Sequence, residues 1–238
     1  MRTIAVLPVK SFGAAKQRLS GLLGGGSRQA LAQAMFSDVL ATLRRVPGLD
    51  AITVVTGDRV AESAAVGERV QVLRDREEAG QSSATLIGLR FATAADYERA
   101  LLVPGDIPLL DADELGALLD RTAARSLGVV IVPDRRGRGT NALLLSPPAA
   151  ITPTFGPGSL ERHLAAARAA GLSHAVEEVP SLGLDVDTPD DFAELAELLE
   201  SRRGQAPMTR GALRQLDRAR VGDPSASASR AERAPASV

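Results

Sequence analysis

The chain has 238 residues, of which 45% are hydrophobic and 24% are charged, and its formal net charge of -1 excludes the strongly basic field that non-specific nucleic-acid binding requires. It contains no cysteine, which excludes disulfides, thiol nucleophiles and thiolate metal sites. The sequence shows neither a signal-peptide pattern nor an apolar run of about 20 residues, so we expect a cytoplasmic protein with one main domain and no membrane or nucleic-acid partner.

Short apolar runs alternate with amphipathic stretches along most of the chain. The strand-like runs are residues 3–9, 51–56, 69–73, 100–104, 128–133, 141–146 and 175–179. The stretches that predict helices are residues 28–46, 58–66, 82–95, 111–124, 159–171 and 189–201. Buried strands that alternate with helices of this length are typical of βαβ units, so we predict an α/β fold with a mostly parallel sheet. The adjacent runs 128–133 and 141–146 predict a β-hairpin excursion within it.

The only two lysines of the chain follow its first predicted strand, and the other 26 of its 28 basic side chains are arginine. They are Lys10 and Lys16, with Arg18 two residues further on. An ammonium is a compact charge that suits phosphate oxygens, and ligands of α/β sheets bind beside strand carboxyl ends. The segment therefore predicts a polyphosphate-binding site, and the alternative is a solvated basic loop after an edge strand.

Acidic residues follow two further apolar runs. Asp106 lies in the turn Pro104-Gly-Asp-Ile-Pro108, and Asp185 and Asp187 are two residues apart, so that on an extended chain they point the same way. Strand carboxyl ends share one edge of a parallel sheet, so these acids can converge with Lys16. Carboxylates beside phosphates suit Mg²⁺, which predicts a metal–nucleotide site. The alternatives are an Asx turn at Asp106 and a helix cap at Asp187.

A second candidate binding loop precedes the helix expected at 159–171. The sequence there is Phe155-Gly-Pro-Gly-Ser159, and Thr140 lies on the predicted hairpin. Exposed backbone N–H groups, hydroxyls and the positive end of a helix together favour an anion. We therefore expect Thr140, Gly156 and Ser159 to bind a small phosphorylated acid, whereas the alternative is an ordinary capped helix after a glycine-rich turn.

The composition changes after about residue 203, where Ser, Ala, Arg, Pro and Gly become frequent. We expect a main domain at 1–203 and a largely disordered tail at 204–238, because the tail lacks enough apolar residues to offset its ordering entropy. The pattern at 210–219 permits only a weak helix.

These motifs together resemble the 2-phospho-L-lactate or phosphoenolpyruvate guanylyltransferases of coenzyme F-420 biosynthesis. The pieces that match, in the order of that family, are Leu7-Pro-Val-Lys10, Ala15-Lys-Gln-Arg-Leu19, Pro104-Gly-Asp-Ile-Pro108, Gly139-Thr-Asn141, Phe155-Gly-Pro-Gly-Ser159 and Asp185-Val-Asp-Thr-Pro189. The resemblance spans residues 3 to about 195. It implies a three-layer, Rossmann-like nucleotide-diphospho-sugar transferase fold with a mixed sheet, a nucleotidyltransferase domain at 1–203, and Mg²⁺ as cofactor.

The resemblance also implies a role for each matched position. The phosphate of an acceptor acid attacks the α-phosphorus of GTP and expels pyrophosphate. The residues implied to be catalytic are Lys16, Arg18 and Asp106. The residues implied to bind GTP are Lys10, Lys16, Arg18, Gln81, Ser82 and Asp106. The implied metal ligands are Asp106, Asp185 and Asp187, and the implied acceptor-binding residues are Thr140, Gly156 and Ser159.

One segment departs from the family pattern. Gly80-Gln-Ser82 stands where many members carry Gly-Leu-Asn, and it is more similar to a Gly-Gln-Ser motif of molybdenum-cofactor cytidylyl- or guanylyltransferases. That family opens with Ala-Gly-x-Ser-x-Arg-Met-Gly, which this chain lacks. A third reading is a non-catalytic nucleotide-binding regulator, which the joint presence of Lys16, Asp106 and Asp187 disfavours.

The acceptor acid is the least determined part of the interpretation. The arginine- and alanine-rich composition is typical of a bacterial genome of high GC content, and bacterial members of the family favour phosphoenolpyruvate. The sequence does not separate this acid from 2-phospho-L-lactate or 3-phosphoglycerate. It also leaves the oligomeric state open, with a homodimer as one arrangement.

Overall fold

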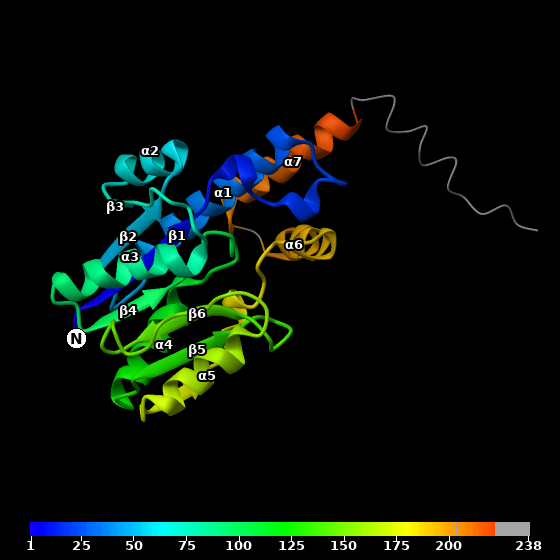
Figure 1. Ribbon diagram of the computed structural model, residues 1–238. Helices are drawn as coiled ribbons and strands as arrows, with labels where there is room; N and C mark the ends of the chain where they lie inside the picture. The colour runs from blue at the N-terminus through cyan, green and yellow to red at the C-terminus, as the bar shows by residue number, and fades with distance from the viewer. Residues whose placement is uncertain (203, 222–238) are drawn as a thin grey trace, which may run out of the picture.

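A single mixed sheet organises the protein, whose computed structural model describes residues 1–202 and 204–221. The strands run in the order β3-β2-β1-β4-β6-β5-β7 (Figure 1). Their bounds are Thr3–Val9 for β1, Ala51–Thr56 for β2, Gln71–Arg74 for β3, Arg99–Leu102 for β4, Val129–Pro133 for β5, Thr140–Leu145 for β6 and His174–Val176 for β7. All neighbours are parallel except that β6 is antiparallel to both β4 and β5.

The helices occupy the predicted stretches, with shifts of a few residues at their ends. Their bounds are Gly25–Leu43 for α1, Arg59–Gly67 for α2, Gln81–Ala94 for α3, Ala112–Ala124 for α4, Ser159–Ala169 for α5, Pro189–Ser201 for α6 and Pro207–Val221 for α7. Capping side chains explain where two of these helices begin. The carboxylate of Asp111 accepts from two N–H groups at the start of α4, and Thr188 forms a capping box with Asp191 at the start of α6.

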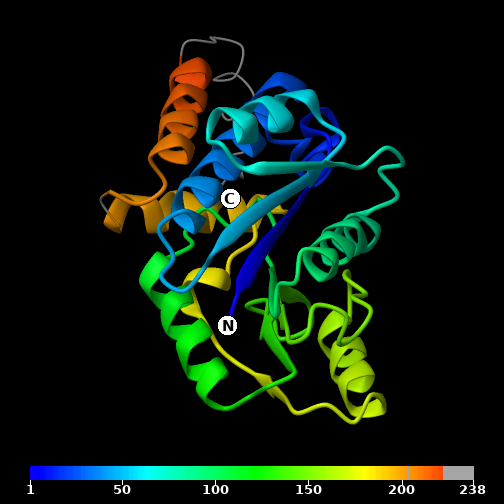
Figure 2. The same cartoon turned by 90° about the vertical axis from the view of Figure 1, so that its left-hand side faces the viewer.

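Two helical layers cover the sheet, as Figure 2 shows from the side. The β1 residues Ala5 and Leu7 face the core beneath α1, α2 and α4, whereas Ile4 and Val6 face the core beneath α3 and α5. This alternation follows from the two-residue period of a strand, and full burial on both faces is typical of a parallel sheet. The predicted α/β fold with three layers is confirmed.

The predicted β5–β6 hairpin is present, and it belongs to the main sheet. Because β6 pairs with β4 as well as with β5, the hairpin carries the sheet onward to β7. Its connecting loop, residues 134–139, therefore lies beside the carboxyl end of β4. None of the described helices is long and apolar enough to cross a membrane.

The chain continues to pack beyond residue 203, at which the sequence analysis ended the main domain. Helix α7 lies alongside α1 (Figure 1). Asp38 of α1 caps it by accepting from the N–H groups of Met208 and Thr209 at 3.1 and 2.7 Å, and Leu213 is buried against the apolar cluster between α1 and α6. The rest of the predicted tail, residues 222–238, lies outside the described residues.

Candidate functional site

Two adjoining cavities open beyond the carboxyl ends of β1 and β4. The first has a volume of about 280 Å³ and lies between the segment after β1 and the start of α3. The second, of about 580 Å³, lies between the β5–β6 loop, the start of α5 and the segment before α6. The residues that line both are Lys10, Gln81, Pro104, Asp106 and Asp187. The position agrees with the rule that ligands bind outside strand carboxyl ends.

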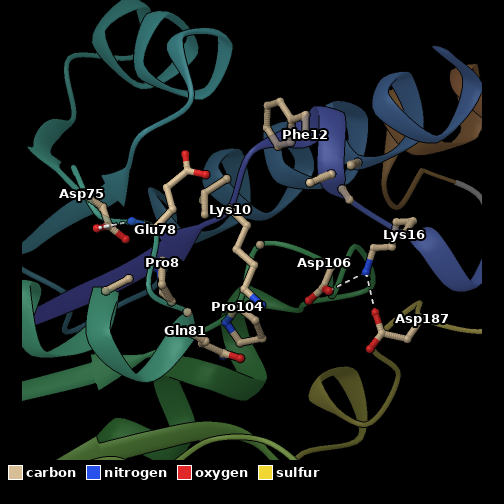
Figure 3. Close-up of a pocket in the computed structure, with 17 residues that line it drawn as sticks. Pro8, Lys10, Phe12, Lys16, Asp75, Glu78, Gln81, Pro104, Asp106 and Asp187 are labelled. Atoms are coloured by element: carbon tan, nitrogen blue, oxygen red, sulfur yellow. Dashed lines mark hydrogen bonds and ion pairs between the residues drawn. The ribbon is translucent and has the colours of Figure 1, made fainter. Parts of the chain in front are cut away.

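Lys16 lines the first cavity and binds Asp106 and Asp187, which line both cavities. It lies between two short 3-10 turns, Phe12–Ala14 and Gln17–Leu19, and has left-handed backbone angles with a φ of 55°. Its ammonium donates to Asp106 Oδ2 at 2.5 Å and to Asp187 Oδ1 at 2.9 Å (Figure 3). Three segments that are distant in the sequence therefore meet at one cation.

The charge state of Lys16 follows from its surroundings. Only 5% of its side chain is exposed, and this burial on its own lowers the pKa. The charges of Asp106 and Asp187, and the hydrogen bonds to them, outweigh the burial and raise the pKa of Lys16 above its ordinary value. Lys16 is therefore a buried cation, which disagrees with the alternative of a solvated basic loop.

The carboxylates of Asp106 and Asp187 are free to bind Lys16, because other groups form the hydrogen bonds of the surrounding backbone. Thr188 caps α6, so Asp187 does not need to, and the backbone carbonyl of Asp106 accepts from Val186 N at 3.3 Å. This last bond ties the turn after β4 to the segment that carries Asp187. Both alternative readings, an Asx turn at Asp106 and a cap at Asp187, are therefore less consistent with the structure than a shared site.

Asp185 lies behind the other two carboxylates, beside Asn141 of β6. The amide of Asn141 donates to Leu182 O at 2.7 Å and to Asp185 Oδ1 at 3.4 Å. Burial, reinforced by the negative charges of Asp106 and Asp187, raises the pKa of Asp185 to about 6. The site thus holds three carboxyl groups against one buried ammonium.

Hard oxygen ligands with excess negative charge suit a divalent cation such as Mg²⁺. Within residues 1–202 and 204–221, no three such groups are already close enough to form a metal cage. The Lys16 ammonium instead lies between Asp106 and Asp187. The residues therefore fit a metal in chemistry, and binding one requires that Lys16 move its ammonium away from at least one carboxylate.

Five cations line the second cavity. Three of them, Lys10, Arg18 and Arg138, have side chains that lack ion-pair and hydrogen-bond partners among the residues that the structure describes. The neighbouring Arg135 is paired with Asp191 and Glu194, and Arg136 lies 3.7 Å from Asp191. The sequence analysis assigned Lys10 and Arg18 but missed Arg138, whose signal was its position between two glycines beside Thr140.

The predicted acceptor-binding residues lie together at the second cavity. Ser159 Oγ lies 3.1 Å from Thr140 Oγ1, and Gly156 forms the turn before them with a φ of 106°. One expectation needs correction here. The backbone N–H groups of Ser159 and Leu160 already donate to Gly156 O and Arg138 O. The hydroxyl of Thr140, rather than these first N–H groups of α5, is therefore the donor available to a ligand, because Ser159 is fully buried and donates to Thr140.

The two residues predicted to lie near the nucleotide base have different surroundings. Gln81 is the first residue of α3 and lines both cavities, whereas Ser82 lines neither. The Ser82 hydroxyl accepts from Phe155 N at 3.0 Å and so holds the loop before α5. The first cavity is also lined by Asp75 and Glu78, which the sequence analysis missed because no motif marks them.

Comparisons with known proteins agree on one family. The family model described as guanylyl transferase CofC like matches residues 3–231. A phosphoenolpyruvate guanylyltransferase from Conexibacter woesei is 50% identical over 216 residues, covering 91% of this chain and 97% of that protein. A 2-phospho-L-lactate guanylyltransferase from Methanothermobacter thermautotrophicus is 35% identical over 195 residues, covering 82% and 84%.

A solved structure agrees on the fold. A provisionally assigned nucleotide-diphospho-sugar transferase from Desulfovibrio desulfuricans G20 superposes with a TM-score of 0.72. Its sequence identity is 19%, and the match covers 91% of this chain and 96% of that protein. At this identity the likeness concerns the fold alone, and it confirms the fold that the motifs implied.

Proposed function

We propose that this chain, which belongs to the family of CofC-like guanylyl transferases, transfers GMP from GTP to the phosphate of a small phosphorylated acid and releases pyrophosphate, as a step of coenzyme F-420 biosynthesis. The observation that carries the proposal is the meeting of Lys16, Asp106 and Asp187 where the two cavities join. The joined cavities offer space for two ligands whose reacting groups meet at that junction.

GTP would occupy the first cavity and extend its phosphates to the junction. Gln81 and the neighbouring walls of the first cavity would face the base. Lys10, Lys16 and Arg18 would neutralise the triphosphate, since each is a cation beside the same opening. Asp106, Asp185 and Asp187 would hold Mg²⁺, which when bound supplies charge neutralisation at the phosphates.

The acceptor would occupy the second cavity. Its phosphate and carboxylate would be bound by the hydroxyl of Thr140, which Ser159 holds in place by a hydrogen bond, and by the turn at Gly156, with Arg138 as an additional cation. A phosphate monoester is mostly doubly ionised near neutral pH, because its second pKa is about 6. One of its oxygens can therefore attack the α-phosphorus of GTP directly, while pyrophosphate leaves from the opposite side.

This chemistry needs no general base from the protein. Catalysis would rest on in-line positioning and on neutralisation of charge by the lysines and Arg18, which is the usual balance in phosphoryl chemistry. The surroundings of His163 support this view, because its ring is fully buried and both of its nitrogens have hydrogen-bond partners inside the protein.

Phosphoenolpyruvate is the acceptor that we favour. The relative from Conexibacter woesei, which is 50% identical, is named for phosphoenolpyruvate, whereas the relative named for 2-phospho-L-lactate is 35% identical. Both acids carry a carboxylate one carbon away from the phosphate-bearing oxygen. The residues around Thr140 would bind those shared groups in either acid.

Mass spectrometry of the product from mixed substrates tests the proposal. The protein is incubated with Mg²⁺, with GTP, CTP and ATP together, and with phosphoenolpyruvate, 2-phospho-L-lactate and 3-phosphoglycerate together. We expect one main product that contains GMP joined to phosphoenolpyruvate, and release of pyrophosphate. A main product made from CTP or ATP would contradict the preference for GTP, and no product with any pair would reject the proposal.

A pair of variants links that activity to the site. Asp106→Asn removes one carboxylate of the junction and should lower turnover by about 10²-fold or more, as expected for loss of a charge that acts on the phosphates. Asp190→Asn is the matched control, because Asp190 is exposed in the first turn of α6. Equal turnover in the two variants would place the chemistry elsewhere.

A further inference from the structure

His163 lies on α5, one turn after Ser159, and its side chain is fully buried. Its Nε2 atom accepts from the backbone N–H of Thr154 at 2.9 Å, and its Nδ1 atom lies 3.0 Å from Thr140 Oγ1. The ring of Phe155 packs edge-on against the imidazole, with centroids 5.3 Å apart and an interplanar angle of 74°. These three contacts therefore fix the orientation of the imidazole ring.

These contacts determine which ring nitrogen carries the proton. A backbone N–H can only donate, so Nε2 of His163 must keep its lone pair toward Thr154. Burial, reinforced by the charge of Arg162, lowers the pKa of His163 to about 4, so the ring is neutral near pH 7. A neutral imidazole has one N–H, which is then on Nδ1 and donates to Thr140 Oγ1.

The direction of the hydrogen bond between His163 and Thr140 determines whether the hydroxyl pair of Thr140 and Ser159 can donate to a ligand. Ser159 Oγ donates to Thr140 Oγ1 at 3.1 Å, which uses the hydroxyl hydrogen of Ser159 and leaves that of Thr140. This second hydrogen cannot be donated to His163, because Nδ1 already carries a proton. It is therefore left for the second cavity, at which Thr140 is slightly exposed whereas Ser159 is fully buried. The opposite tautomer would accept that hydrogen and leave only lone pairs facing the cavity.

We propose that His163 is a positioning residue that makes the Thr140–Ser159 hydroxyl pair a hydrogen-bond donor toward the anionic acceptor substrate. The inference rests on the proposed function, because it takes the second cavity as the binding site of the phosphorylated acid. His163 does not touch that acid, since its ring is buried behind Thr140. An anionic oxygen needs a donor, so the pair binds phosphate or carboxylate only in this orientation.

Two substitutions separate the two ring nitrogens. The side-chain amide of His163→Asn places an N–H near the position of Nδ1 and keeps the bond to Thr140. The amide of His163→Gln places an oxygen near the position of Nε2 and keeps only the bond from Thr154. We expect His163→Gln to raise the KM for phosphoenolpyruvate about tenfold, as for one lost hydrogen bond, and His163→Asn to raise it less than about threefold. The KM for GTP should change in neither.

A double-mutant cycle tests whether His163 acts through Thr140. Thr140→Val removes the hydroxyl, so adding His163→Gln to it should raise the KM for phosphoenolpyruvate by less than about twofold. His174→Asn is the control, because it changes the other histidine of the chain, which lies on β7 and donates from Nδ1 to the carbonyl of Leu172. Equal KM values in the two His163 variants, or a full effect of His163→Gln beside Thr140→Val, would overturn the inference.

An NMR measurement on the unmodified protein covers the case in which the variants do not fold. Long-range ¹⁵N–¹H spectra report which ring nitrogen is protonated, and the chain has only two histidines to assign. We expect an Nδ1–H tautomer for His163, and an Nε2–H tautomer would overturn the inference. A wild-type protein that turns over no phosphorylated acid would reject the proposed function, and with it the substrate that the inference names, whereas the spectra test only the orientation of the His163–Thr140 hydrogen bond.

Discussion

At the scale of single residues, the unexpected feature is the ion pair that joins Lys16 to two proposed metal ligands. The sequence analysis expected Lys16, Asp106 and Asp187 to converge, because the carboxyl ends of parallel strands share one edge of a sheet. It could not predict that the ammonium would lie between the carboxylates at 2.5 and 2.9 Å, because that depends on the backbone path of residues 11–20. In this arrangement Lys16 holds the position that a divalent cation would share.

Lys16→Met tests this competition. Methionine keeps an unbranched apolar stem but lacks the ammonium, so turnover should fall by about 10²-fold or more through loss of charge neutralisation at the phosphates. The two carboxylates, freed from their cation, should bind Mg²⁺ more tightly in the absence of nucleotide. Thermal melting with and without Mg²⁺ measures this second effect, which does not depend on activity.

The matched control for Lys16→Met is Lys10→Met, because Lys10 lines the same cavities and has no side-chain partner among the described residues. We expect Lys10→Met to leave the Mg²⁺-dependent melting shift unchanged. If Lys16→Met melts far below the wild type and turns over normally, the role of Lys16 is structural. An unchanged Mg²⁺ shift in Lys16→Met would contradict the competition between ammonium and metal.

At the scale of elements, periodicity and caps were sufficient for most of the fold. The predicted strands 3–9 and 51–56 have the observed bounds, because continuous β-branched and aliphatic runs between polar segments are strong strand signals. Helix α7 was underestimated, since its sequence offers few apolar residues and its partners on α1 are distant in the chain. Tertiary contacts decide such a helix, and a local pattern cannot show them.

The approach of α3 to β1 is an element-scale constraint that positions the start of α3 beside the first cavity. A Cβ atom added at Gly88 would lie 2.2 Å from Val6 Cγ1, in the centre of the sheet. Gly88→Ala should therefore destabilise the fold by about 1–3 kcal/mol, in the range of overpacked cores. Chemical denaturation followed by circular dichroism measures this loss.

Two further variants make the Gly88 prediction specific. Val6→Ala combined with Gly88→Ala should recover part of the stability, because the two changes exchange volume at one contact. Gly211→Ala on α7 is the control, since nothing lies within 4 Å of the added carbon, and it should be neutral or stabilising by up to about 1 kcal/mol. A neutral Gly88→Ala would show that α3 can move away from β1 at little cost.

At the scale of the whole molecule, the sequence predicted where the site lies better than how its parts are held. The convergence of Lys16, Asp106 and Asp187 follows from one topological rule, whereas the tethering of Phe155 by Ser82 depends on how α3 and α5 sit on the sheet. The order of the hairpin strands in the sheet could not be predicted from the sequence either. No local pattern states that β6 lies between β4 and β5.

The whole-molecule prediction concerns helix α7, which covers an apolar surface formed by α1 and α6. Leu31 and Met35 of α1 are fully buried in the cluster that also contains Leu213 of α7. Deleting residues 204–238 should therefore lower the melting temperature by several degrees, because roughly 1 kcal/mol shifts the midpoint by about 2–4 °C in a chain of this size. Deleting only residues 222–238, which the sequence predicts to be disordered, should leave it unchanged.

A substitution of Asp38 tests whether α7 is held by its contact with α1. Its carboxylate accepts from the N–H groups of Met208 and Thr209, so Asp38→Ala removes the cap of α7 and should cost about 1–2 kcal/mol in the full chain. In the chain deleted from residue 204 the cap has nothing to bind, so the same substitution should cost nothing or even stabilise α1, because alanine has a higher helix propensity than aspartate. A loss of equal size in both chains would mean that Asp38 supports α1 itself, and that α7 is not held by this contact.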